Sequence, residues 1–172
     1  MSLSLYQSTI PTYLQITGAI AGLIDKAEAH CTNNDLSPDE LIHARLADDM
    51  LSFAYQIHSV ATHSLGAIEG VKKGVFSPNM TPPPVDFAGL RQRIADARSG
   101  LEALTEADIN ALEGKPMRFE YGDFKIDFVA EKFLLSFSQP NFYFHATTAY
   151  DILRWKGLAI GKSDFMGQLR TV

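Results

Sequence analysis

The chain has 172 residues, of which 46% are hydrophobic and 20% are charged, and its formal net charge is −5. This composition is typical of one globular domain over residues 1–172 and excludes a disordered chain. The basic residues form no run that could follow a phosphate backbone, and no apolar run reaches the roughly 18 residues of a membrane span. We therefore expect no nucleic-acid and no membrane partner. The single cysteine, Cys31, excludes an intramolecular disulfide and suits a reducing cytoplasm.

Apolar residues at helical spacing predict the helices before residue 113. The segment Ser37-Pro38-Asp39-Glu40 is typical of a helix start, because serine can cap the helix, proline fits its first position and glutamate completes a capping box. The prolines of residues 77–84 disfavour helix and predict a long extended loop. The predicted helices cover residues 3–30, 38–45, 47–72 and 86–104, with a short turn or helical extension over 106–112.

Residues 117–128 change from a helical to an alternating pattern. Apolar and polar side chains alternate over 117–121 and again over 124–128, on the two sides of Gly122-Asp123. This pattern is typical of a β-hairpin. Because two strands alone are marginally stable, the hairpin must pack on the helices. Its aromatic side chains are expected to cover the end of the bundle or a partner subunit.

The last helix is predicted to begin at residue 130 and to end at Lys156. Pro140 lies inside it, so we expect a short helix to Ser138, a break, and a second helix that Ser138 caps. Gly157 is suited to the left-handed conformation that often follows a helix. The tail, residues 158–172, is predicted to be irregular.

Two histidines, His58 in the second long helix and His145 in the last, lie on apolar helix faces. Inward imidazoles on facing helices could form part of a zinc or nickel site in a bundle core. A catalytic metal usually needs three protein ligands, however, and the positions four residues before and after His145 are Asn141 and Ala149. His63, five residues after His58, is expected to point in a different direction. The preferred interpretation is that both are core histidines bonded to neighbours, with no cofactor.

The last helix also has a polar face that could line a small-ligand pocket. The candidate lining residues are Tyr143, Thr148, Asp151 and Arg154. Asp151 and Arg154 are three residues apart and could pair, although an exposed pair contributes little stability. A carboxylate and a basic group would support acid–base chemistry only inside a pocket.

Three segments carry a resemblance to a known family. They are Leu46–Val71, FAGLRQRI from Phe87 to Ile94, and above all PNFYFHATTAYDILRWKGLAIGKSDFMG from Pro140 to Gly167. These segments resemble the DUF1993 family, bacterial and fungal proteins of unknown function, which is similar to the DinB/YfiT-like four-helix bundles. The resemblance implies a mainly α fold: an up-down-down-up, DinB-like four-helix bundle with a short β-hairpin before the last helix.

The same resemblance implies a candidate site and an assembly. Many DinB-like proteins are assigned a three-histidine metal site, with one ligand on the second helix and a His-x-x-x-His pair on the fourth; some are thiol-dependent transferases, and homodimers are common. His145 matches the fourth helix, His58 lies on the second, and Ala149 stands where the remaining histidine would be. We therefore predict a cytoplasmic homodimer with a degenerate metal or small-ligand site at His58 and His145. The alternative is a non-catalytic dimeric binding or structural module in which both histidines are packing residues.

Overall fold

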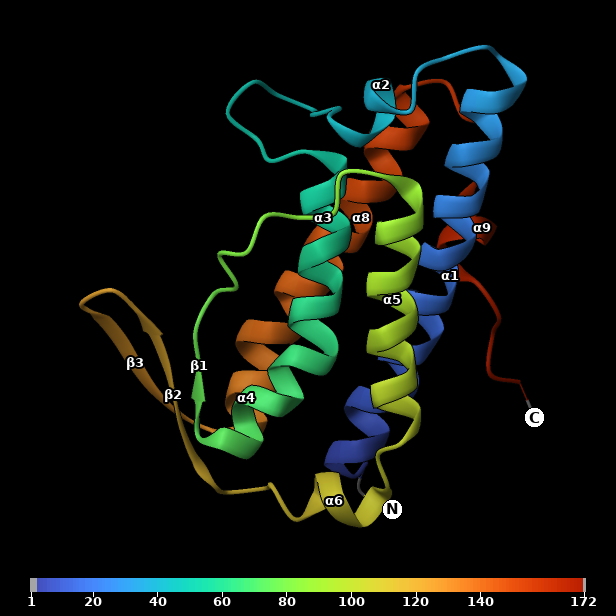
Figure 1. The fold of residues 1–172 in the computed structure, drawn as a ribbon. Helices are drawn as coiled ribbons and strands as arrows, with labels where there is room; N and C mark the ends of the chain where they lie inside the picture. Colours follow the sequence, from blue (N-terminus) through green and yellow to red (C-terminus); the bar gives the residue numbers. More distant parts are fainter. Residues whose placement is uncertain (1–2, 172) are drawn as a thin grey trace.

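Four long helical segments form the bundle, which is seen in a computed structural model that describes residues 3–171. In the order of the chain the segments are α1 (Leu5–Asn33); α3, η1 and α4 (Phe53–Ala61, Thr62–Gly66 and Ala67–Lys73); α5 (Phe87–Glu102); and α7, η2 and α8 (Ala130–Phe133, Leu134–Ser138 and Gln139–Trp155). The labels η1 and η2 denote single π-helical turns. In Figure 1, α1 and α8 run upward while α3 and α5 run downward, which confirms the up-down-down-up connection.

The bundle core is a set of apolar side chains from all four segments. Closely packed neighbours are α1 with α5 and α3 with α8. Fully buried examples are Ile20 of α1, Ile57 of α3, Ile94 of α5 and Ile152 of α8, each with 0% of its surface exposed. Burial of such side chains contributes about 1.5–3 kcal/mol each, so packing of these faces is the main source of stability. No helix within residues 3–171 combines the length and the apolar character needed to cross a membrane.

The second long helix begins later than predicted. α2 covers only Asp39–Ile42, and α3 starts at Phe53 rather than at residue 47. Ser52 caps α3, because its hydroxyl accepts a hydrogen bond from the backbone N–H of Tyr55. A serine cap fixes the helix start more strongly than the helical spacing of the preceding residues does.

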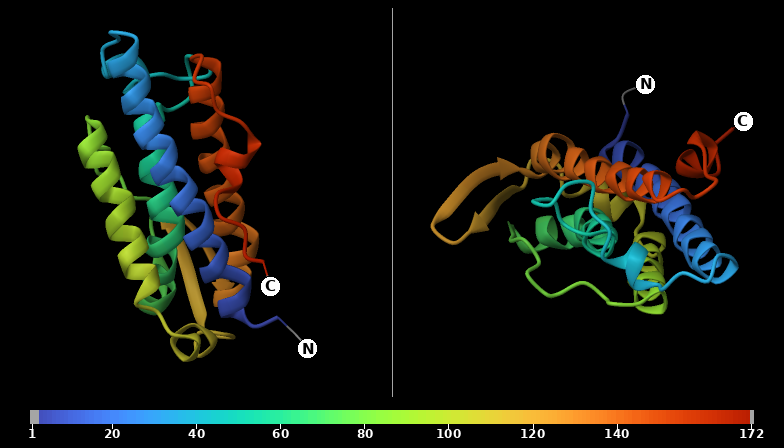
Figure 2. Two further views of the ribbon diagram at one scale, coloured as in Figure 1. Left: turned by 90° about the vertical axis from the view of Figure 1, so that its right-hand side faces the viewer. Right: turned by 90° about the horizontal axis from the view of Figure 1, so that it is seen from above.

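The predicted hairpin is confirmed and belongs to a three-stranded sheet. β2 (Pro116–Tyr121) pairs antiparallel with β3 (Phe124–Val129), and β1 (Val75–Phe76) pairs parallel with β2. A strand of two residues has no alternation that a sequence could reveal, so β1 was not predicted. Figure 2 shows the hairpin projecting from one side of the bundle.

The last helix continues past Pro140 without the predicted break. Ser138 has helical backbone angles and caps nothing; it belongs to η2, which leads directly into α8. Proline lacks the N–H of a regular helix and clashes with the carbonyl four residues earlier. The wider π-helical turn before Pro140 changes this spacing, so the helix can accommodate the proline.

Two further short helices lie outside the four long segments. α6 (Glu106–Asn110) follows α5, and the predicted irregular tail contains α9 (Lys162–Met166). α9 packs beside α1, on the side away from the hairpin (Figure 2). Asp164 of α9 forms an ion pair with Lys26, and the Met166 carbonyl accepts a hydrogen bond from Gln15. These long-range contacts order a tail whose own sequence has no helical period.

Candidate functional site

The two π-helical turns meet at one place in the bundle. His63 lies in η1 and Ser138 in η2, and the Ser138 hydroxyl donates a hydrogen bond of 3.0 Å to the His63 carbonyl. π-helical turns are rare and occur frequently at functional sites. Two of them joined by a side-chain hydrogen bond therefore mark this region as the first candidate site.

The imidazole rings of His63 and His145 lie side by side at this junction. Their centroids are 5.7 Å apart, and the ring planes differ by 16°. His145 Nδ1 lies 2.7 Å from Gln56 Oε1, which can only accept, so this nitrogen carries the proton. Ser138 uses its one hydrogen on the His63 carbonyl, so it accepts from His63 Nδ1–H at 3.4 Å. Both histidines are therefore assigned the tautomer in which Nε2 has a free lone pair.

Burial keeps both imidazoles neutral. It lowers the pKa of His63 to about 3, with a further contribution from the neighbouring His145, and it lowers the pKa of His145 to about 4. A general base works best when its pKa is near the operating pH. At neutral pH the two Nε2 atoms are thus weak bases but good hydrogen-bond acceptors.

Aromatic side chains surround the pair. Tyr55 lies 6.3 Å from the His145 ring, while Phe76 and Phe137 lie 5.5 Å and 6.2 Å from the His63 ring. Within residues 3–171 neither Nε2 atom has a hydrogen-bond partner, and neither is sealed from solvent. The arrangement offers two acceptors beside aromatic rings that are tilted or edge-on to the imidazoles.

The structure pairs His145 with His63, whereas His58 has a different neighbour. His58 is 4% exposed, and its pKa is lowered by burial and by the charge of Arg93 on α5. The sequence analysis did not mention Gln56, it gave Ser138 only a capping role, and it did not join His63 to His145. One signal was present: Gln56 and His63 are seven residues apart, about two helical turns, and so share a helix face.

The four residues predicted to line a pocket have different surroundings along α8. The Tyr143 hydroxyl forms a hydrogen bond with α1, and Thr148 is 5% exposed. Asp151 is exposed, and Arg154 donates to a backbone carbonyl just beyond the helix end. None of the four lines the groove and hollows described below.

A three-histidine metal centre does not fit the residues present. Ala149, four residues after His145, is completely buried and has no ligand atom. Asn141, four residues before it, uses its side-chain amide to donate to the Phe137 carbonyl. Across the described part of the chain, no three His, Cys, Asp or Glu side chains are grouped so that they could hold a metal ion.

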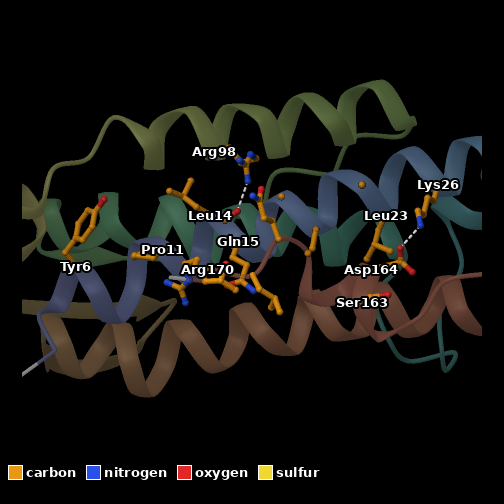
Figure 3. A pocket seen from close by; sticks show the side chains of 17 residues that line it. Tyr6, Pro11, Leu14, Gln15, Leu23, Lys26, Arg98, Ser163, Asp164 and Arg170 are labelled. Carbon is orange, nitrogen blue, oxygen red and sulfur yellow. Dashed lines mark hydrogen bonds and ion pairs between the residues drawn. The ribbon is translucent and has the colours of Figure 1, made fainter.

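A larger groove of about 900 Å³ lies between α1 and the C-terminal tail (Figure 3). Three of its four charged side chains are engaged in structural contacts, because Lys26 pairs with Asp164 and Arg98 donates to the Leu14 carbonyl. The fourth, Arg170, forms no ion pair within the described part of the chain. A second hollow of about 600 Å³ lies on the sheet, beside the exposed pair of Arg118 and Asp127. Neither brings free polar groups together as the histidine pair does.

Comparison with known proteins agrees with this architecture. The chain is similar to a crystal structure described as a DinB family member protein from Shewanella denitrificans, with a TM-score of 0.81 and 27% sequence identity, over 98% of this chain and 94% of that one. No curated protein matches the chain. The family described as "Domain of unknown function (DUF1993)" matches residues 5–166. This match covers nearly the whole DinB-like bundle, and the chain therefore belongs to the DUF1993 family.

Proposed function

We propose that this protein binds a small organic molecule carrying hydrogen-bond donors, and that Nε2 of His63 and Nε2 of His145 accept from it. The observation that carries the proposal is the anchoring of both Nδ1–H groups, by Gln56 and by Ser138. Without these partners each imidazole could exchange tautomers, and the direction of its hydrogen bonds would be undefined.

The surroundings favour a flat, partly aromatic ligand. Tyr55 and Phe137 are partly exposed, and their rings lie 6.3 Å from the His145 ring and 6.2 Å from the His63 ring; Phe76 is buried against His63. A phenol, or a compound with two adjacent hydroxyl groups such as catechol, has the donors and the planar body for this site. Because the two imidazoles are such weak bases, the site supports binding better than proton abstraction.

Calorimetric titration with phenol and catechol tests this proposal. Catechol should bind the wild-type protein saturably, and His63→Phe and His145→Phe should each lose binding by about tenfold or more, since each removes one acceptor. His43→Ala is the control, because His43 is exposed at the end of α2 and is not among the residues of the histidine pair. His58→Ala tests separately whether His58 contributes to catechol binding.

Two results would contradict the proposal. One is equal catechol binding by the wild type and the His63→Phe variant. The other is stoichiometric zinc in protein purified without a histidine tag, lost in His63→Phe and His145→Phe, because that would make the pair a metal site.

A second proposal concerns assembly: two copies associate through the hairpin tip, in the cytoplasm. Tyr121 and Phe124 are paired in register next to the turn, and their side chains are 56% and 59% exposed. Aromatic side chains exposed together favour a protein partner. The unpaired thiol of Cys31 supports a reducing compartment. If both histidines only pack, this dimeric module is the alternative function.

A further inference from the structure

A separate polar hollow of about 310 Å³ lies between α4, α5 and the chain that follows β1. Its polar lining residues are Thr62, Glu69, Lys73, Ser77, Asn79 and Arg93. Phe76 also lines it and packs against His63, so one aromatic ring stands between this hollow and the histidine pair. Nothing in the proposed function uses this hollow.

The charges around the hollow favour an anion. Lys73 and Arg93 provide two positive charges, and Glu69 provides one negative charge, which leaves one positive charge in excess. Over residues 3–171, no ion pair joins Glu69 to either cation. A ligand with a single negative charge would balance this set.

Arg93 is only partly satisfied by the protein. One of its terminal nitrogens donates to the Thr62 hydroxyl at 3.4 Å, whereas its Nε is buried and has no partner in the described chain. His58, one helical turn before Thr62, is 4% exposed, and neither of its ring nitrogens has a partner there. Thr62 links the two residues, because its hydroxyl donates to the His58 carbonyl at 3.0 Å and accepts from Arg93.

These unmatched groups need a partner that the protein does not provide. A buried polar group left without a hydrogen bond costs about 1–3 kcal/mol, and such groups in native proteins are usually satisfied. The Arg93 Nε–H and the remaining N–H of neutral His58 are both donors. Of the two residues only Arg93 lines the hollow, so the oxygen atoms of an anion bound there would accept from its guanidinium.

We propose that this hollow binds a small monocarboxylate with a polar substituent, with Arg93 as its main binding residue. The planar guanidinium matches a carboxylate through two parallel hydrogen bonds, which a lysine cannot reproduce. Lys73 adds a second positive charge. The Ser77 hydroxyl and the Asn79 amide are suited to a hydroxyl substituent.

The test is a ¹H–¹⁵N NMR titration with sodium lactate, with sodium chloride at equal ionic strength as the reference. Lactate should cause saturable shifts of the amides of Thr62, Glu69 and Ser77. Arg93→Gln should weaken binding by about tenfold or more, because the fork of donors is lost. Arg91→Gln should bind as the wild type does, since Arg91 lies on the same helix but pairs with residues of α1.

Three further measurements support the interpretation of this titration. If Arg93→Gln does not fold, Arg93→Lys retains the charge and should still weaken binding, because it cannot form the bidentate contact. The double variant His63→Phe/His145→Phe should bind lactate normally, so failure at the histidine pair stays distinct from failure here. Lactate bound at Arg93 should also raise the pKa of His58, and NMR can follow this change.

Three outcomes would overturn the proposal. The first is a lactate response no larger than that to chloride. The second is unchanged lactate binding by both Arg93 variants. The third is tighter Arg93-dependent binding of inorganic phosphate than of lactate, which would replace the carboxylate with a phosphate group.

Discussion

Replacing Gln56 by leucine should change both the stability of the bundle and the chemistry of His145. The Gln56 side chain is 2% exposed; its Oε1 accepts from His145 Nδ1–H at 2.7 Å, and its Nε2 donates to the Leu51 carbonyl at 2.9 Å. Gln56→Leu keeps a similar side-chain volume but removes both hydrogen bonds. The His145 N–H and the Leu51 carbonyl then lose their partners.

The cost follows from these two groups. An unsatisfied buried group costs about 1–3 kcal/mol, but Leu51 is 48% exposed, so water can replace part of the lost bond. We therefore expect a loss of about 2 kcal/mol in the free energy of unfolding. Urea unfolding followed by circular dichroism measures this change.

The effect on His145 is the sharper readout. Without Gln56 its proton is free to move to Nε2, and ¹⁵N chemical shifts of the imidazole ring distinguish the two tautomers. Gln56→Glu is the matched control, because a carboxylate still accepts from Nδ1–H; it should hold the tautomer and raise the pKa of His145. If His145 stays protonated at Nδ1 in Gln56→Leu, then Gln56 does not set its tautomer and our interpretation of the site is wrong.

Three other predictions address the wider structure. The free energy of unfolding should be lower at pH 5 than at pH 7.5 by about 1–2 kcal/mol per histidine. The folded-state pKa values of His63 and His145 are depressed to about 3 and 4. Only the unfolded chain therefore takes up protons at these two residues as the pH falls through 6.5. The loss of stability should begin near pH 7 and level off as the pH passes below these folded-state pKa values. Urea unfolding of His63→Phe/His145→Phe should show a flatter dependence of stability on pH. The same dependence in the variant and the wild type would contradict the depressed histidine pKa values. Gly70→Ala should destabilise the protein by about 1–3 kcal/mol, since the new Cβ would lie 3.0 Å from the side chain of Phe76 in β1. Gly22→Ala meets nothing within 4 Å and should be neutral or slightly stabilising. Equal melting temperatures for the two variants would refute this contrast. Phe124→Ser should convert a dimer to a monomer in sedimentation velocity, and a wild-type protein that is monomeric at tens of micromolar would rule out the hairpin interface.

Helix and strand periods alone predicted most of the architecture. The long helices and the hairpin have side chains that repeat with the period of their own backbone, so no tertiary information was needed to find them. The prediction was wrong at Pro140, because proline rules were applied to a regular α-helix and the chain forms a π-helical turn there. It also missed β1, which exists only because β2 lies beside it.

By itself the sequence determined that His145 lies on an apolar helix face and that Ala149 provides no metal ligand. Only the tertiary structure decided that His145 meets His63 and Gln56, two residues that share a face of the facing helix. It also placed Arg93 of α5 beside Thr62, whose hydroxyl donates to the His58 carbonyl, although Arg93 and His58 are far apart in sequence. The physical reason is that periodicity fixes which side of a helix a residue occupies, whereas the packing of helices fixes which residue it meets.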